Sequence, residues 1–330
     1  MLLWGGFLAL IFFFLALDLG VFHREDQKVS TKEAFAWTSV WVTLSLAFSG
    51  VVYWLYENGV ANNVENLSSY QAMLDYLTGY LIELSLSMDN IFVIAVIFTY
   101  FQIPKEYQHR VLFWGILGAI VFRALMIVLG IVLIRQFSWM TFVFGLILLY
   151  SAYKMLRSGD HEVDPRRNPV VQFIKRYFPV TKNYDGHRFF VRRRHIVAAT
   201  PLFIALVVVE TTDILFAIDS IPAILAITTD PFLVFSSNIF AILGLRSLYF
   251  VLASMLDRFH LLKYSLVFIL AFVGVKMLLL HYVHFPEWVS LGVIALALEG
   301  GVLASLISTA GSEKILKKMI SGVDFLGFKT

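Results

Sequence analysis

Residues 207–223 read VVVETTDILFAIDSIPA and place three carboxylates, Glu210, Asp213 and Asp219, in an otherwise apolar segment. A charge in such surroundings is costly unless it is paired or solvated. The whole chain is similarly apolar: 59% of its 330 residues are hydrophobic, only 15% are charged, and the mean hydropathy is +0.79. A soluble domain of this composition could not cover its surface with polar groups. These features predict an all-α, polytopic membrane protein.

Nine apolar segments are long enough to cross a bilayer as helices, which requires roughly 20 residues each. The first segment lacks the basic start and the small-residue cleavage site of a signal peptide, so we interpret it as a membrane span. The predicted spans are residues 3–22, 34–56, 72–101, 110–134, 138–156, 196–228, 232–256, 262–283 and 288–310.

The loops that connect these spans alternate between loops rich in lysine and arginine and loops that contain neither. Loops after odd-numbered spans are basic, and loops after even-numbered spans contain neither residue, with Arg135 as the exception. Residues 157–195 carry ten basic against four acidic residues and are expected to form a cytoplasmic connector. Because an excess of lysine and arginine marks cytoplasmic loops, we predict an N-terminus outside and a C-terminus in the cytoplasm. This topological use accounts for the net charge of +3, and nothing indicates nucleic-acid binding.

A three-span pattern occurs twice in the chain. ELSLSMDNIFVIAVIF, from residue 83, resembles DILFAIDSIPAILAI, from residue 213, and the likeness continues through GILGAIVFRAL and NIFAILGLRSL. The alignment pairs Glu83 with Asp213, Asp89 with Asp219, Asn90 with Ser220, Arg123 with Arg246, and Lys154 with Lys276.

Because each copy has an odd number of spans, the second copy enters the membrane from the opposite side. Such inverted repeats are typical of transporters whose substrate site lies near the membrane midplane. We therefore predict a single membrane transport domain over residues 1–330. Its parts are a two-helix extension (1–71), the first inverted repeat (72–156), the connector (157–195), the second inverted repeat (196–283), and a last helix with a cytoplasmic tail (284–330).

Five acids lie well inside the predicted spans, and each costs at least about 2.5–3.5 kcal/mol at a helix centre if it is ionised without partners. We expect Arg123 and Arg246 to neutralise some of them, but two arginines cannot neutralise five carboxylates. The others must be protonated, bind a cation, or alternate between the two. The candidate metal ligands are Glu83, Asp89, Glu210, Asp213 and Asp219, with Asn90 and Ser220 as secondary candidates.

Ligand chemistry narrows the choice of metal. Carboxylate, amide and hydroxyl oxygens suit a hard divalent ion such as Mn²⁺, Mg²⁺ or Ca²⁺. The chain has no cysteine, and its eight histidines fall in loops or at span ends, which disfavours zinc or copper. No HExxH motif and no nucleophile paired with a base is present, so we do not expect an enzyme.

Helix geometry leaves two arrangements open for these acids. Asp213 and Asp219 are six residues apart, as are Glu83 and Asp89, and this spacing leaves each pair about 120° out of alignment. In one arrangement the helices break at the site, which Pro222 favours in the second copy. Alternatively, intact helices present their acids to two different cavities. Lys154 and Lys276, near span ends, are expected to extend toward the membrane surface.

The chain resembles the TerC family of bacterial membrane proteins, within the LysE-type transporters, and most resembles its Alx-like branch. The stretches that carry the likeness are DLGVFHR, VSTKEAFAWTSVWVTLSL, LTGYLIELSLSMDNIFV and ETTDILFAIDSIPAILAITTDPFLVFSSNIFAILGLRSLYF, spread over nearly the whole chain. The resemblance implies a bacterial inner-membrane protein that exports Mn²⁺, in a family named for tellurite resistance. It also implies that the five acids form the ion site.

We therefore expect a secondary transporter that moves Mn²⁺ out of the cytoplasm by alternating access, with protons as a possible counter-ion and no permanently bound cofactor. Its expected partners are the divalent ion and the lipid bilayer, and the sequence identifies no protein partner. The alternatives are an exchanger or channel for Ca²⁺ or H⁺, and a membrane partner in a tellurite- or stress-resistance complex.

Overall fold

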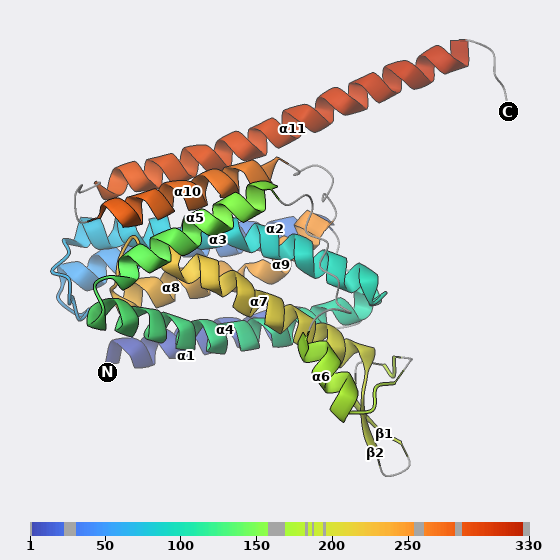
Figure 1. The fold of residues 1–330 in the computed structure, drawn as a ribbon, viewed down its shortest axis with the longest axis horizontal. Helices are drawn as coiled ribbons and strands as arrows, with labels where there is room; N and C mark the ends of the chain where they lie inside the picture. The colour runs from blue at the N-terminus through green and yellow to red at the C-terminus, as the bar shows by residue number, and fades with distance from the viewer. Residues whose placement is uncertain are drawn as a thin grey trace.

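The computed structural model describes residues 2–22, 31–157, 169–181, 184–186, 188–193, 196–253, 261–280 and 286–325, and most of these are helical (Figure 1). Part of the predicted connector and the end of the C-terminal tail lie outside these ranges. The helices are α1 (Leu2–Phe22), α2 (Thr31–Glu57), α3 (Ser69–Tyr100), α4 (Lys105–Gln136), α5 (Met140–Arg157), α6 (Pro169–Tyr177), α7 (Pro201–Leu225), α8 (Pro231–Leu243), α9 (Leu245–Ala253), α10 (Leu262–Leu279) and α11 (Glu287–Phe325).

Seven of the described helices are long and apolar enough to cross a membrane, and the pair α8 and α9 raises the number to eight if it counts as one span. This pair corresponds to the predicted single span 232–256, but it bends by 43° at Gly244. The apolar part of α1, Leu2–Leu17, is shorter than the others. The membrane class is thus confirmed, whereas the predicted number of nine spans is not.

The connector contains regular structure that the sequence analysis did not predict. Helix α6 packs on α7, and strands β1 (Phe190–Arg193) and β2 (Ile196–Ala199) form an antiparallel hairpin. The Tyr184 hydroxyl donates to the carbonyl of Phe101 at 2.5 Å, and Arg110 stacks over the Phe189 ring. The described part of the connector therefore rests on the turn between α3 and α4. The all-α class is confirmed, since the described chain is mostly helical, but a sixth span beginning at residue 196 was wrong, because residues 196–199 belong to the hairpin and α7 begins at Pro201.

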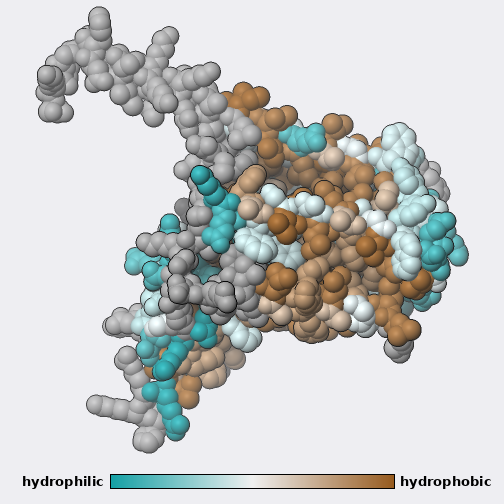
Figure 2. Space-filling model, turned by 180° about the vertical axis from the view of Figure 1, so that it is seen from behind, coloured by the Kyte–Doolittle hydropathy of each residue, from teal (hydrophilic) through white to brown (hydrophobic). Residues whose placement is uncertain are grey.

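Helices α3 and α7 form the centre of the bundle. Helix α4 packs against α7, α8 packs against α3, and α4 and α8 contact each other. Helices α5 and α10 form a closely packed pair beside them, and α2 and α11 contact α3. Figure 1 shows α11 lying along α10 and extending beyond the bundle, and Figure 2 shows hydrophobic residues over the middle of one face with hydrophilic residues gathered toward its ends. An apolar middle between polar ends suits a protein that spans a bilayer.

The α5–α10 pair approaches closely because glycine lies at its crossing. A Cβ at Gly274 would lie 3.1 Å from the carbonyl oxygen of Gly145, and a Cβ at Gly145 would lie 2.9 Å from Leu278. Gly274 also faces Leu148 and Leu149. Later residues of α5 therefore contact earlier residues of α10, so the two helices are antiparallel. Helices α3 and α7 are antiparallel as well, since Gly79 faces Ile224 while Asn90 bonds Asp213. Both relations agree with an inverted repeat, which stays a prediction.

Replacing Gly274 by leucine should separate α5 from α10, because small residues let membrane helices approach. Overpacking of this kind costs about 1–3 kcal/mol. The measurement is thermal unfolding of purified protein in detergent, followed by size-exclusion chromatography. Gly292→Leu is the matched control, because nothing lies within 4 Å of a Cβ there. Equal stability of the two variants would contradict the proposed packing.

Candidate functional site

A buried arginine joins the two halves of the molecule. Arg123 of α4 is 1% exposed, and its Nε and Nη2 atoms donate to the two carboxylate oxygens of Asp213 of α7, at 3.2 and 3.0 Å. Its Nη1 atom also forms an ion pair with Glu83 of α3, which is 0% exposed. Three helices therefore meet through one guanidinium, whose planar fork suits such multiple contacts. Arg123 thus contacts two of the five predicted acids.

Neutral polar groups complete this cluster. The Asn90 side chain donates to Asp213 at 2.8 Å, and Ser87 donates to Glu83 at 3.2 Å. Arg123 Nη1 donates further to the side-chain oxygens of Asn238 at 3.0 Å and Ser220 at 3.4 Å. Two carboxylates thus share one cation and several dipoles, and the Oε2 atom of Glu83 is buried without a hydrogen bond. The cluster carries a net negative charge when both acids are ionised.

The spacing of these residues explains how they share one face. Glu83 and Asn90 are seven residues apart on α3, and Asp213 and Ser220 are seven apart on α7, so each pair lies within about 20° on its helix. Both α3 and α7 are continuous through the site. The predicted break at Pro222 was therefore wrong, since this proline lies in the last turns of an unbroken α7. The alternative of intact helices with acids on two faces is confirmed.

Asp89 and Asp219 lie on the other faces of α3 and α7 and line a cavity of about 370 Å³. Ser151 of α5 donates to Asp219 Oδ1 at 2.6 Å, and Lys154, one turn further along α5, lines the same cavity. The remaining wall is mostly apolar and comes from α3, α5, α7 and α10. This cavity collects oxygen donors from both predicted repeats. Lys154 was expected only to extend toward the membrane surface.

Glu210 takes a third position, away from both groups. Its carboxylate lies against Gly118 of α4, where any Cβ would collide with it. Its Oε2 atom is buried without a hydrogen bond. A glycine is needed at residue 118 for Glu210 to keep this place between α4 and α7.

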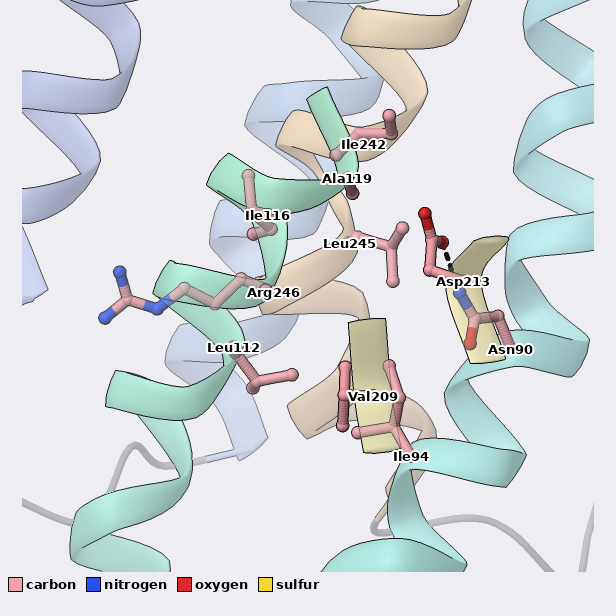
Figure 3. A pocket seen from close by; sticks show the side chains of 11 residues that line it. Asn90, Ile94, Leu112, Ile116, Ala119, Val209, Asp213, Ile242, Leu245 and Arg246 are labelled. Carbon is pink, nitrogen blue, oxygen red and sulfur yellow. Dashed lines mark hydrogen bonds between the residues drawn. The ribbon is translucent and has the colours of Figure 1, made fainter. Parts of the chain in front are cut away.

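Arg246, which aligns with Arg123, is placed differently from it. It is buried and lines a small cavity of about 30 Å³ together with Asn90 and Asp213. Figure 3 shows its side chain directed away from Asp213, across the cavity from the carboxylate. The two predicted repeats therefore differ at the centre, where Arg123 contacts the acids of both halves.

The five predicted acids do not form one site in this conformation. Within the described ranges, no group of three or more His, Cys, Asp or Glu side chains is placed to hold one metal ion. Asn238, Ser151 and Gly118 also belong to these sites, and the sequence analysis missed all three. Asn238 could have been identified from the sequence, because it begins the NIFAILGLRSL stretch of the second copy. Ser151 and Gly118 are common residues in membrane helices, and no feature of the sequence marked them as site residues.

Comparison with known proteins places these features in a family. Residues 68–313 match the model of the Integral membrane protein TerC family. The chain belongs to the TerC family. This match covers α3–α5 and α7–α10, and therefore every acid of the site. The resemblance drawn from the sequence motifs is thus confirmed.

The TerC-family chain also has close full-length relatives. It is 48% identical over 93% of its length to the "Uncharacterized membrane protein STKORF319" of Myxococcus xanthus, of which it covers 92%. It is 46% identical over 89% of its length to the "Putative membrane-bound redox modulator Alx" of Escherichia coli K12, of which it covers 90%. No solved structure matches the chain. The Alx-like character is therefore confirmed as well.

Replacing Arg123 by alanine should strongly destabilise the protein, because it leaves two buried carboxylates without their counter-charge. Losing one partner of a buried ion pair costs about 3–5 kcal/mol. Arg123→Lys should also lose stability, since an ammonium cannot bond both acids in a fork. The measurement is thermal unfolding in detergent at neutral pH.

The control for this experiment is Arg135→Ala at the exposed end of the same helix, where a change within about 0.5 kcal/mol is expected. An Arg123→Ala protein as stable as this control would contradict the central role of the ion pair.

Proposed function

We propose that this TerC-family protein is a secondary transporter that exports Mn²⁺ from the cytoplasm. The observation that carries the proposal is the cavity shared by Asp89 and Asp219, two acids at matching positions of the predicted repeats. Transporters built from inverted repeats bind substrate where the repeats meet. Cargo binding there would involve one carboxylate from each half.

The donors around this cavity suit a hard divalent cation. Asp89 and Asp219 supply carboxylate oxygens, and the Ser151 hydroxyl, already bonded to Asp219, supplies a third oxygen. A volume of about 370 Å³ leaves room for an ion that keeps part of its water shell. Mn²⁺, Mg²⁺ and Ca²⁺ all accept such ligands, so the preference for Mn²⁺ rests on the family resemblance.

The central acids would enter the cycle at a later stage. Glu83 and Asp213 are engaged with Arg123 in this conformation. Movement of one half against the other would change these contacts and expose the acids to the opposite side, as alternating access requires. Glu210, wedged beside Gly118 at the α4–α7 contact, would respond to the same movement. In this scheme all five acids serve the transported ion in turn.

The second candidate function is a redox or stress-resistance role, because the Escherichia coli relative is named a redox modulator. The present chain has no cysteine, so a thiol-based redox role has no residue to perform it. Action within a tellurite- or stress-resistance complex would instead require a surface for another protein. Such a partner protein would tolerate changes in the cavity acids, whereas a transporter would not.

Asp89→Asn and Asp219→Asn should each leave the protein folded and inserted while abolishing metal transport. The amide keeps the size of the side chain and removes the charge that offsets dehydration of the cation. The measurement is Mn²⁺ uptake into everted membrane vesicles, with Mg²⁺, Ca²⁺ and Zn²⁺ in parallel. The matched control is Glu299→Gln, an exposed acid within α11. Unchanged uptake in both asparagine variants would refute the site.

The export direction depends on the predicted orientation, which single cysteines can test because the chain has none of its own. Asn62→Cys, in the loop between α2 and α3, should react with an impermeant maleimide on intact cells. Asp185→Cys, in the connector, should react only after the membrane is opened. Both side chains are exposed, so burial would not mask them. The reverse labelling pattern would invert the orientation.

A further inference from the structure

Two more buried acids lie at the opposite end of the bundle from the connector, outside the cation site. Asp75 is in the second turn of α3 and is 3% exposed, and Asp230 precedes α8 and is 1% exposed. Neither belongs to the five acids of the transport site. A buried ionised carboxylate without a partner is costly, so their presence requires an explanation.

Each acid has an oxygen without a hydrogen bond, and the neighbouring Tyr56 hydroxyl beside Asp230 is also buried without one. Asp230 caps α8 through Oδ1, which accepts from the backbone N–H groups of Phe232 at 2.9 Å and Leu233 at 3.3 Å. Its Oδ2 atom, like Oδ1 of Asp75, is buried without a hydrogen bond. These atoms point to a ligand that brings its own hydrogen to a carboxylate oxygen.

The surrounding charges are mostly negative. Glu65 is within electrostatic reach of both acids and accepts from the Thr228 side chain at 2.9 Å and from the backbone of Thr229 at 2.8 Å. Lys276 of α10, 2% exposed, is within electrostatic reach of Asp75 but forms its ion pair with Glu287 of α11 at 3.3 Å.

The two basic residues described at this end, Lys276 and Arg135, have other partners. Lys276 also donates to Ser290, at 3.0 Å, so its expected extension toward the membrane surface was wrong. Arg135 of α4 is exposed and donates to the backbone carbonyl of Thr229 at 3.4 Å. Within the described residues, neither of them makes an ion pair with Asp75 or Asp230.

Proton binding fits this environment better than metal binding. Burial raises the pKa of Asp230, and the Glu65 charge adds to this effect, while the Tyr56 hydroxyl and the two N–H groups of the α8 cap oppose it. Asp75 is within electrostatic reach of both Glu65 and Asp230. Negative charges near a buried carboxylate favour its protonated form.

The helices that carry the pair lead directly to the transport site. Asp75 precedes Glu83 by eight residues on α3, and Asp230 precedes Asn238 by eight on α8, which is about 12 Å of helix in each case. Between these levels the helices pack tightly, because a Cβ at Gly79 would lie 2.9 Å from the Ser237 hydroxyl. Both Glu83 and Asn238 contact Arg123. A change in spacing at the pair therefore reaches the arginine cluster.

We propose that Asp75 and Asp230 form an external proton-binding site that couples proton entry to cation export. A hydronium ion gives its proton to one carboxylate and remains as water, which removes the repulsion between the acids. Loss of the proton restores that repulsion and shifts α3 against α8. This inference rests on the proposed transport function and identifies its coupling ion.

The test compares two modes of transport by the purified full-length protein in liposomes. Mn²⁺ uptake driven by an imposed pH gradient requires proton coupling, whereas exchange of radioactive for unlabelled Mn²⁺ at equal pH requires only the cation site. Asp75→Asn should reduce gradient-driven uptake at least about tenfold, the size of a typical coupling effect, and should keep exchange near the unmodified level. Asp75→Glu should retain both modes.

Asp230→Asn is the second variant, because asparagine can still cap α8 and the fold should survive. Glu57→Gln, an exposed acid at the same end of the bundle, is the matched control and should leave both modes unchanged. Full gradient-driven uptake in the Asp75→Asn and Asp230→Asn proteins would overturn the proposal. So would a parallel loss of exchange in well-folded protein, which would indicate a metal site. If the unmodified protein moved no Mn²⁺ in either mode, the transport function itself would fail.

Discussion

The buried contact of Arg123 with Glu83 and Asp213 is the interaction on which the arrangement of this bundle depends. A guanidinium that is 1% exposed must be fully paired, and here its partners come from α3, α7 and α8. The contact fixes α4 against both halves of the molecule and sets the rotation of α3 and α7 about their axes. Once these faces are set, Asp89 and Asp219 are turned toward α5 and α10.

That rotation divides the charge of the core between two environments. On one face, acids are held by an arginine and several neutral dipoles. On the other, two acids line a cavity in which Ser151 and Lys154 are the polar neighbours contributed by α5. The acids of the core are therefore divided between two surroundings, and in the proposed scheme they serve the cation in turn. Arg123 bonds Asp213, whereas Arg246 is directed away from that carboxylate (Figure 3), so the two arginines are placed differently in this conformation.

Part of this arrangement could be predicted from the amino-acid sequence. The apolar runs predicted the membrane class, and the motifs predicted the TerC family and the partnership of Arg123 with intramembrane acids. The six-residue spacing of Asp213 and Asp219 left two geometries open, and only packing could decide between them. Pro222 favoured a broken helix, but neighbouring helices support α7 through that turn. The bend at Gly244, the connector hairpin and the buried position of Lys276 depend on contacts between distant segments, which local patterns do not reveal.

The central claim is that this chain moves a divalent cation through the membrane. Purified protein in liposomes, with an imposed pH gradient and a metal-sensitive dye inside, measures this without any other cellular component. The account predicts saturable Mn²⁺ accumulation that depends on the gradient and is accompanied by proton movement in the opposite direction. Liposomes containing folded protein that accumulate Mn²⁺ no faster than empty liposomes would contradict it.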